Sequence, residues 1–348
     1  MDSPGKGKYS SRPRLVVSRC LGFERCRWNG LTIASPEVDA LCPYAEIVTV
    51  CPEVEVGLGV PRAPVRIVGA PGAERLVQPS AGRDITDEMI SYAAGRLAAI
   101  GSVDGFILKS RSPSCGVKDA RIFSSTERVA ASGRTTGLFA REVVRRFPGV
   151  PVEDEGRLTN FRIREHFLEA VFTVASFREL RARAFTTAQT AGAGSATEAG
   201  RTPAGRAAQM LTEFHAANKL LLMAHSQAGM RRLGRIAANS DRLPLVDVFE
   251  SYAQGLESAV GQLPRPTNVV NVLMHAMGYF KDELSSREKR FFLDLIDRFR
   301  RGRVPLSAVL AVLREWIARF DVPYLEAQTF FAPFPEALAS IRDSGPGR

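Results

Sequence analysis

Five cysteines have the clearest capacity for chemistry in this 348-residue chain, and all of them lie in its first third. They are Cys20, Cys26, Cys42, Cys51 and Cys115. A disulfide-stapled secreted domain usually has an even number of cysteines in a shorter chain, whereas the reduced thiols of a cytosolic enzyme more often serve a metal or catalysis. The odd number and the clustering therefore favour a metal site in a cytoplasmic protein.

Three of these cysteines follow short apolar runs that are typical of buried strands, at residues 15–18, 47–50 and 105–108. The runs lead to Cys20, to Cys51 and, through a loop, to Cys115. In a parallel sheet the carboxyl ends of the strands share one edge, and ligands bind outside it. Free cysteine is often only a small buried hydrophobe, but these three lie in loops rich in Gly, Pro and Ser. We therefore expect them to form one metal site.

Three thiolates are soft ligands that suit an iron–sulfur cluster or zinc. Structural zinc sites usually contain a C-x-x-C pair, and the sequence has none. A [4Fe-4S] cluster ordinarily has four cysteine ligands, so a set of three would leave one iron open for substrate. Cys26 stays open as a fourth ligand, and Cys42 is interpreted as a bystander.

Polar residues beside these cysteines are candidates for catalysis. Glu53 lies two positions after Cys51, and a partly desolvated carboxylate near a cluster would have a raised pKa suited to proton transfer. An exposed loop glutamate is the alternative. Ser112 and Ser114 flank a proline before Cys115, where they could orient substrate or water, or simply form a turn.

The elements that must position these residues belong to the first of two predicted domains. Helical patterns at 86–100 and 138–147 alternate with the strands, which predicts an α/β domain with an open, mostly parallel, Rossmann-like sheet over residues 13–183. Residues 1–12 are polar, and we expect a disordered lead-in without a secretory signal.

Residues 184–204 are small and rich in Thr, Ala and Gly, which predicts a flexible linker. From 205 to 340 the pattern predicts an all-α domain of five to seven helices. The expected helices are 207–230, 245–260, 268–280, 285–301 and 306–320. No apolar run approaches the ~20 residues of a membrane span, so no membrane partner is expected.

The chain has 47 Lys and Arg against 37 Asp and Glu, a formal net charge of +10. A basic protein suits a phosphate-rich partner such as RNA, although charge also aids solubility. The candidate RNA contacts are Lys109, Arg111, Lys219, Arg231 and Arg232. Solvated surface charge is the alternative for each of them.

Beyond these patterns, the segments SRCLGFERCRWNG, VCPEVEVGLGVPR, RLVQPSAGRDIT, DGFILKSRSPSCG and GLFA…VEDEGRL resemble the thiouracil desulfidase family over residues 12–170. The resemblance implies a [4Fe-4S] cluster on three cysteines, with one open iron that takes sulfur from the thiocarbonyl of the base. By position, Cys20, Cys51 and Cys115 match the ligands. Glu53 and Ser112 match the catalytic carboxylate and serine.

The helical half resembles the YbgA-type domain over residues 205–338, through EFHAANKLLLMAHSQ, NVLMHAMGYFKDELSSREK and PYLEAQTFFAPFPEAL. Fused proteins of this layout are implicated in removing sulfur from 4-thiouridine in tRNA, with the helical half holding the RNA. We therefore expect a cytoplasmic, non-redox tRNA 4-thiouridine desulfidase. The alternatives are a desulfidase of free thiouracil or thionucleosides, a sulfur insertase, and an RNA-binding adaptor with a structural cluster. The absence of a G-x-x-x-x-G-K-[ST] phosphate loop disfavours the insertase.

Overall fold

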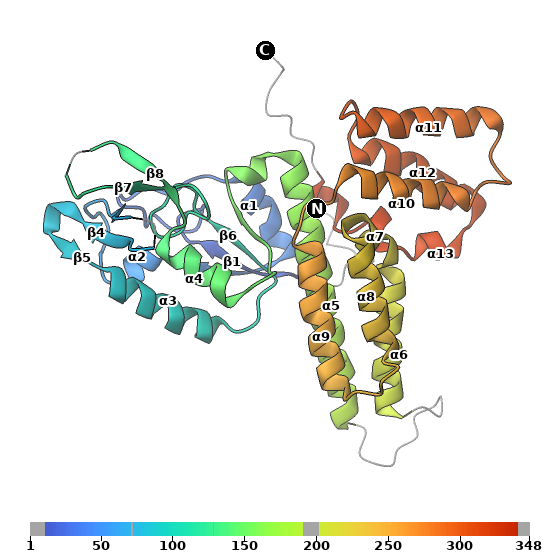
Figure 1. The fold of residues 1–348 in the computed structure, drawn as a ribbon, viewed down its shortest axis with the longest axis horizontal. Coiled ribbons are helices and arrows are strands. Elements are labelled where there is room, and N and C mark those ends of the chain that lie inside the picture. Colours follow the sequence, from blue (N-terminus) through green and yellow to red (C-terminus); the bar gives the residue numbers. More distant parts are fainter. Residues whose placement is uncertain (1–10, 71, 128, 191–201, 340–348) are drawn as a thin grey trace. The chain divides into compact units, whose positions relative to one another are not determined.

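A computed structural model describes residues 11–70, 72–127, 129–190 and 202–339 (Figure 1). The chain forms two compact units. The first extends to Ala175 and includes the chain from Ala337, and the second is Ser176–Glu336. Each unit has its own core, and the two are described separately below as the α/β unit and the helical unit. No described helix is long and apolar enough to cross a membrane.

The α/β unit contains a four-stranded sheet in which every neighbouring pair is parallel, in the order β2-β1-β6-β9. Its strands are β1 (Arg14–Ser18), β2 (Glu46–Val50), β6 (Gly105–Leu108) and β9 (Val152–Asp154). Both central strands, β1 and β6, are almost wholly buried, as continuous apolar runs should be in a covered parallel sheet. The predicted α/β class and parallel sheet are confirmed.

A second sheet has five strands in the order β5-β4-β3-β7-β8 and was not predicted. The strands are β3 (Arg66–Val68), β4 (Arg75–Gln78), β5 (Arg83–Asp84), β7 (Ala120–Phe123) and β8 (Ala131–Thr135). The β3–β7 pair is parallel and the other pairs are antiparallel. These strands are short, and several carry arginine or glycine, so their alternation is too weak to detect as a pattern.

Two longer helices of the α/β unit, α3 (Thr86–Ile100) and α4 (Leu138–Arg146), agree with the predicted ranges. Helix α3 buries Met89, Ala93 and Leu97 at a spacing of four residues, which places them on one face against the core. Two shorter helices, α1 (Pro36–Leu41) and α2 (Pro52–Glu55), begin with proline at the first helical position, where no N–H donor is needed.

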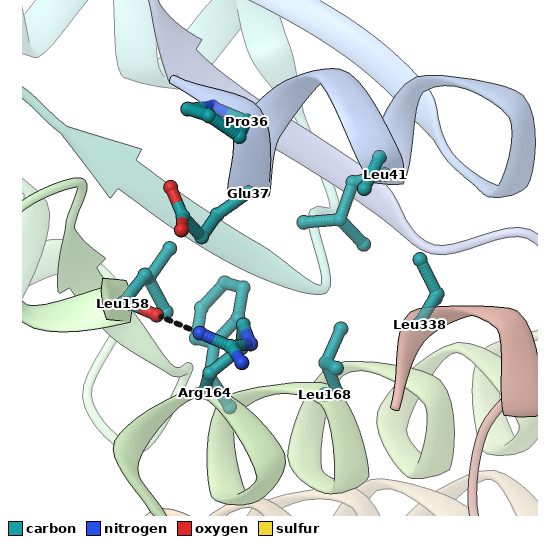
Figure 2. A pocket seen from close by; sticks show the side chains of 9 residues that line it. Pro36, Glu37, Leu41, Leu158, Arg164, Leu168 and Leu338 are labelled. Carbon is teal, nitrogen blue, oxygen red and sulfur yellow. Dashed lines mark hydrogen bonds between the residues drawn. The ribbon is translucent and has the colours of Figure 1, made fainter. Parts of the chain in front are cut away.

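A small apolar cavity of about 30 Å³ lies between α1 and the first turns of α5 (Phe161–Thr190) (Figure 2). Arg164, which is 8% exposed, donates from Nη1 to the carbonyl oxygen of Leu158 at 2.9 Å. Leu41, Leu168 and Leu338 line the same space. A cavity of this size holds about one water molecule, so it belongs to the packing of the unit and is too small for a substrate.

Helix α5 corrects the predicted linker. Residues 184–190 are helical because α5 continues to Thr190. Ala184 is 2% exposed, and the ring of Phe185 lies 5.2 Å from that of Phe249, so packing stabilises a segment whose composition is poor in apolar residues. The linker also ends earlier than predicted, because α6 begins at Pro203 with Thr202 as its N-cap. Residues 191–201 of the predicted linker, 1–10 of the lead-in and 340 lie outside the described residues.

The described part of the helical unit contains no strand, so its predicted all-α class is confirmed there. After α5 its helices are α6 (Pro203–Ala217), α7 (Lys219–His225), α8 (Gln227–Ala238), α9 (Leu245–Val260), α10 (Pro266–Gly278), α11 (Ser286–Arg300), α12 (Leu306–Phe320) and α13 (Pro323–Glu326). Aromatic rings form much of its core. The ring centroids of Phe177 and Tyr252 lie 5.1 Å apart, and those of Phe292 and Trp316 lie 4.9 Å apart.

The single helix predicted over 207–230 is wrong, because α6, α7 and α8 replace it. With the short α13 as well, the described residues after α5 form more α-helices than the predicted five to seven. Asn218 separates α6 from α7, and Ser226 separates α7 from α8. The Asn218 amide donates to the carbonyl of Phe214 and accepts from the hydroxyl of Thr329. Ser226 adopts an extended conformation and caps α8 by accepting from the N–H of Gly229 at 3.0 Å. Asn and Ser favour such caps over helix interiors because their side chains bond to nearby backbone groups.

Candidate active site

Four cysteines line one cavity of about 370 Å³ in the α/β unit, which will be called the cysteine cavity. Cys20 lies two residues after the end of β1, Cys51 follows β2 directly, and Cys115 lies in the loop after β6. Because β2, β1 and β6 are parallel neighbours, their carboxyl ends bring these three cysteines together, as the sequence predicted. The fourth is Cys26, whose position in the sequence alone did not assign it to the site.

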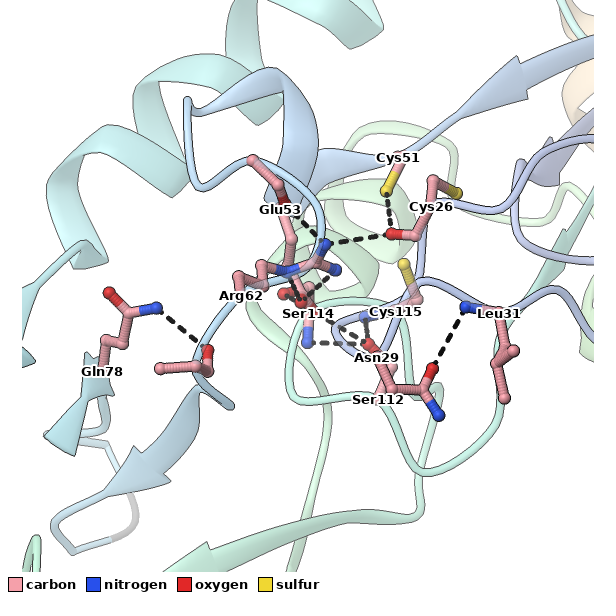
Figure 3. A network of polar contacts seen from close by, with 12 residues as sticks. Cys26, Asn29, Leu31, Cys51, Glu53, Arg62, Gln78, Ser112, Ser114 and Cys115 are labelled. Atoms are coloured by element: carbon pink, nitrogen blue, oxygen red, sulfur yellow. Dashed lines mark hydrogen bonds and ion pairs between the residues drawn. The ribbon is translucent and has the colours of Figure 1, made fainter. Parts of the chain in front are cut away.

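Hydrogen bonds and burial link these thiols. The thiol of Cys51 donates to the carbonyl of Cys26 at 3.8 Å (Figure 3). A hydrogen bond with Cys26 and burial raise the pKa of the Cys51 thiol well above its usual value. Burial raises the pKa of Cys115 to about 12, and a hydrogen bond with Cys20 is the largest cause that raises the pKa of Cys26 to about 11. These groups are therefore neutral thiols unless a cation stabilises their thiolates.

The donor set of the cavity consists of free thiols. All five cysteines are free thiols, and Cys42 is absent from the residues that line the cavity. No three His, Cys, Asp or Glu side chains of the described residues surround one point closely enough to hold one metal ion. Separate thiols around a cavity are the arrangement that an iron–sulfur cluster needs, since each cysteine binds a different iron. Cys20, Cys26, Cys51 and Cys115 all line this cavity.

Glu53 lies in the same cavity, on the helix that starts directly after Cys51. Its Oε2 accepts from Nε and Nη2 of Arg62 at 2.9 and 2.7 Å, and its Oε1 accepts from the hydroxyl of Ser114 at 3.0 Å. The side chains of Glu53 and Arg62 are only 13% and 4% exposed. Arg62 also donates to the carbonyl of Cys26 at 3.0 Å. The charged pair is thereby anchored beside the thiols (Figure 3).

Ser112 has a different environment from that of Ser114. Its hydroxyl oxygen accepts from the backbone N–H groups of Ser114 and Cys115 at 3.2 and 3.0 Å. Its own contact with Glu53 Oε1 is longer, at 3.5 Å. Ser112 therefore organises the loop that presents Cys115, while Ser114 makes the shorter contact with the carboxylate.

Glu55 supports the site, and sequence reasoning missed it. Its Oε1 accepts from the N–H of Cys51 at 3.1 Å and from Arg19, while its Oε2 accepts from the hydroxyl of Tyr92 at 2.5 Å. Arg96 lies 3.8 Å from the same carboxylate. These contacts hold the start of α2. The only hint in the sequence is that Glu55, like Glu53, belongs to the CPEVE segment.

Two basic residues that were predicted to contact RNA lie beside this cavity. The Nζ of Lys109 donates to Glu155 Oε1 at 2.5 Å, and the side chain of Lys109 is 16% exposed. Glu155 also accepts from the N–H and the hydroxyl of Ser110. Burial alone would raise the pKa of Glu155, but Lys109 and Ser110 hold it below its ordinary value. Lys109 is thus internally paired, whereas Arg111 is exposed with a left-handed φ of 58°.

The remaining predicted RNA contacts lie in the helical unit. Lys219 begins α7, while Arg231 and Arg232 are consecutive residues of α8. All three are exposed. Of these, Arg232 lines a cavity of the helical unit.

Two known families match this chain. The family described as 2-thiouracil desulfurase matches residues 15–155. A family described as a protein of unknown function, DUF1722, matches residues 219–335. The first match contains the strands and cysteines of the cavity, and the second covers most of the helical unit.

Two curated relatives are similar to this chain. The uncharacterized protein YbgA of Escherichia coli (strain K12) is 33% identical over 136 residues, which cover 39% of this chain and 80% of YbgA. The uncharacterized protein YbbK of Bacillus subtilis (strain 168) is 34% identical over 134 residues, which cover 36% of this chain and 87% of YbbK.

A solved structure described as a [4Fe-4S]-dependent thiouracil desulfidase, TudS, is 30% identical to this chain. The match covers 42% of this chain and 94% of TudS, with a TM-score of 0.34. Together with the cysteine cavity, the family matches and the two relatives show that this chain belongs to the 2-thiouracil desulfurase family and carries a YbgA-like DUF1722 region behind it.

Proposed function

We propose that this chain is an iron–sulfur desulfidase that converts 4-thiouridine in tRNA to uridine and releases sulfide. The observation that carries the proposal is the meeting of Cys20, Cys26, Cys51 and Cys115 with Glu53 in one cavity. Membership of the 2-thiouracil desulfurase family supports desulfidase chemistry on a thiolated uracil. The net charge of +10 supports an RNA substrate.

The proposed cofactor is a [4Fe-4S] cluster on Cys20, Cys51 and Cys115, with one iron free of protein ligands. When bound, such a cluster supplies a Lewis-acidic site for the thiocarbonyl sulfur. The four thiols are soft ligands without disulfide partners, which suits them to iron and sulfide. Cys26 lines the same cavity, and its backbone carbonyl accepts from the Cys51 thiol, so it can share or support this ligand set.

The proposed reaction is a hydrolysis, since thiocarbonyl and water become carbonyl and hydrogen sulfide with no net change of oxidation state. Glu53 accepts the proton of the water that attacks the ring carbon bearing sulfur. Arg62 holds one carboxylate oxygen through two hydrogen bonds, so the other is directed to Ser114 and the cavity. A base inside folded tRNA must leave its stack to reach such a site.

Anaerobic purification with iron and sulfide analysis, followed by incubation with substrates, tests this proposal. The substrates are tRNA containing 4-thiouridine, free 4-thiouracil and free 2-thiouracil. About four irons per chain and release of sulfide from the tRNA are expected. Sulfide release from a free base alone would retain the chemistry and reject the RNA substrate. A zinc protein, or a cluster protein inert on all three substrates, would reject the reaction.

A further inference from the structure

Trp28 contributes an aromatic ring to the wall of the cysteine cavity. Among the described residues that line this cavity, it is the sole aromatic one. Trp28 is 46% exposed, and in the part of the chain that the structure describes no other ring and no guanidinium group packs on its indole. Single exposed apolar side chains are common on protein surfaces, but this one lines the space in which the thiols and Glu53 meet. The indole is therefore available to a molecule that enters the cavity.

Hydrogen bonds fix the backbone of the segment that carries Trp28. The Trp28 carbonyl accepts from the N–H of Arg62 at 2.8 Å. Two residues earlier, the Cys26 carbonyl accepts from Nη1 of Arg62 at 3.0 Å. Farther along the segment, the N–H of Ile33 donates to the carbonyl of Cys20 at 2.8 Å. These bonds tie the segment to Arg62 and to a cysteine of the cavity, so the position of the Trp28 backbone is set by the site itself.

Arg62 also holds the proposed proton acceptor. Its guanidinium donates to Glu53 Oε2 at 2.9 and 2.7 Å, while its backbone N–H donates to Trp28. One residue thus fixes both the carboxylate and the backbone that carries the ring. A planar base stacked on this ring would have its plane set relative to Glu53 and the thiols. Catalysis requires such orientation of the reacting carbon toward the group that activates water.

The chemistry of the substrate favours an aromatic surface. A thiolated uracil has no net charge, so ion pairs with the charged groups of the cavity cannot hold it. Stacking on an aromatic side chain is available to every base, because each base has a π face. A base that leaves its stack in a folded RNA loses contact with its neighbours, and aromatic or apolar side chains of an enzyme replace that contact. Among the lining residues, the indole of Trp28 offers the largest flat surface for this purpose.

We propose that the uracil ring of the substrate stacks on the indole of Trp28. This inference rests on the proposed function, which places a thiolated uracil in the cysteine cavity. The indole nitrogen is a hydrogen-bond donor only, so Trp28 neither accepts the proton of water nor binds iron. Its role is to bind and orient the base. Loss of the ring should therefore weaken binding without slowing the chemical step.

Steady-state kinetics of sulfide release from free 4-thiouracil test this role in anaerobically purified, full-length protein. The variants are Trp28→Ala and Trp28→Phe. Phe23→Ala is the matched control, because Phe23 lies in the same loop between β1 and α1, is 40% exposed and is not among the described residues that line the cavity. We expect Trp28→Ala to raise KM roughly tenfold with kcat near the wild-type value. Trp28→Phe keeps a ring and should recover most of this loss, and Phe23→Ala should match the wild type.

The split between KM and kcat distinguishes stacking from a structural role. KM does not depend on the fraction of molecules that carry a cluster, so a raised KM cannot result from lost iron. Iron and acid-labile sulfide are measured in each variant. A lower kcat with unchanged KM in Trp28→Ala would overturn the inference, because Trp28 would then only support the fold. Equal rises of KM in Trp28→Ala and Phe23→Ala, or in Trp28→Ala and Trp28→Phe, would overturn it as well.

Calorimetric titration with free uracil separates failure of this inference from failure of the proposed function. Uracil contains no sulfur, so its binding is measured without turnover. Binding of uracil that is roughly tenfold weaker in Trp28→Ala than in the wild type would support stacking even if no sulfide were released from 4-thiouracil. Sulfide release with the same KM, and the same Kd for uracil, in Trp28→Ala and the wild type would retain the proposed function and overturn the role of Trp28.

Discussion

Two cavities of the molecule differ in how their charged groups are held. The cysteine cavity is the one lined by Cys20, Cys26, Cys51 and Cys115, and the arginine cavity is a cavity of about 560 Å³ in the helical unit that Arg232, Arg235 and Arg265 line. In the cysteine cavity, Glu53 and Arg62 are 13% and 4% exposed and pair with each other. In the arginine cavity, Arg232, Arg235 and Arg265 are exposed and no lining residue of the described chain is acidic. In the cysteine cavity the positive and negative side chains neutralise each other without a ligand. In the arginine cavity no acidic side chain of the described residues neutralises the arginines.

This difference is the one expected between a site that reacts and a site that binds an anion. A buried ion pair loses much of its hydration, so it is retained only where geometry and further hydrogen bonds compensate. Groups fixed in that way are preorganised for charge that develops during a reaction. Exposed arginines stay hydrated until a polyanion neutralises them, so they lose little hydration free energy on folding. Their contribution to binding therefore depends strongly on the salt concentration.

The largest effect is expected from the thiols. Cys51→Ser and Cys115→Ser should abolish both iron binding and sulfide release, because serine is a poor ligand for a soft metal centre. Cys42→Ser is the control, since Cys42 does not line the cavity. Iron and acid-labile sulfide are measured in anaerobically purified protein. If Cys42→Ser loses as much iron as Cys51→Ser, the cavity does not define the ligand set.

Glu53→Gln should lower the rate of sulfide release by roughly 10²–10⁴-fold, the usual contribution of a positioned acid or base. The amide keeps the shape of the carboxylate but cannot take a proton. Iron content should stay at the wild-type level, because Glu53 is not among the proposed ligands. The comparison of rate with iron content is decisive: parallel losses would make Glu53 a structural residue rather than a proton acceptor.

Arg62→Met should destabilise the protein by about 3 kcal/mol, because it leaves the Glu53 carboxylate nearly buried without its cation. Arg83→Met is the matched control, since the pair of Arg83 with Glu88 is 42% and 50% exposed. Removal of such a surface pair should change stability by less than about 1 kcal/mol. Urea denaturation measures both. Equal changes would mean that the cysteine cavity does not hold its charges more tightly than the surface does.

The sequence predicted the parallel sheet and the convergence of Cys20, Cys51 and Cys115 because both follow from strong local patterns. Each strand is a continuous apolar run, and a parallel sheet must bring its carboxyl ends to one edge. Helix α3 was equally readable, since its apolar residues repeat with the helical period.

The partners of the predicted residues could not be read in the same way. Arg62 pairs with Glu53 nine residues away, and Tyr92 donates to Glu55 from a distance of 37 residues. No local pattern encodes such pairs, which depend on how the elements pack. The break between α7 and α8 was missed because Ser226 interrupts a continuous apolar period with one extended residue. The role of Ser226 as the N-cap of α8 becomes evident only in the structure, where the N–H of Gly229 donates to its hydroxyl oxygen.

The smallest effect of this series is expected from a change in salt concentration, which should weaken tRNA binding but leave the reaction at the cysteine cavity unchanged. Raising monovalent salt from about 50 to about 200 mM should weaken tRNA binding by roughly 20- to 40-fold if about three phosphates are neutralised. Sulfide release from free thiouracil should not change, because the base is uncharged and the Glu53–Arg62 pair is shielded from solvent ions. Anisotropy with tRNA and a sulfide assay with the free base are run in the same buffers. A parallel decline of both would show that the cysteine cavity also responds to solvent ions, and the distinction between a closed reaction site and an open binding site would fail.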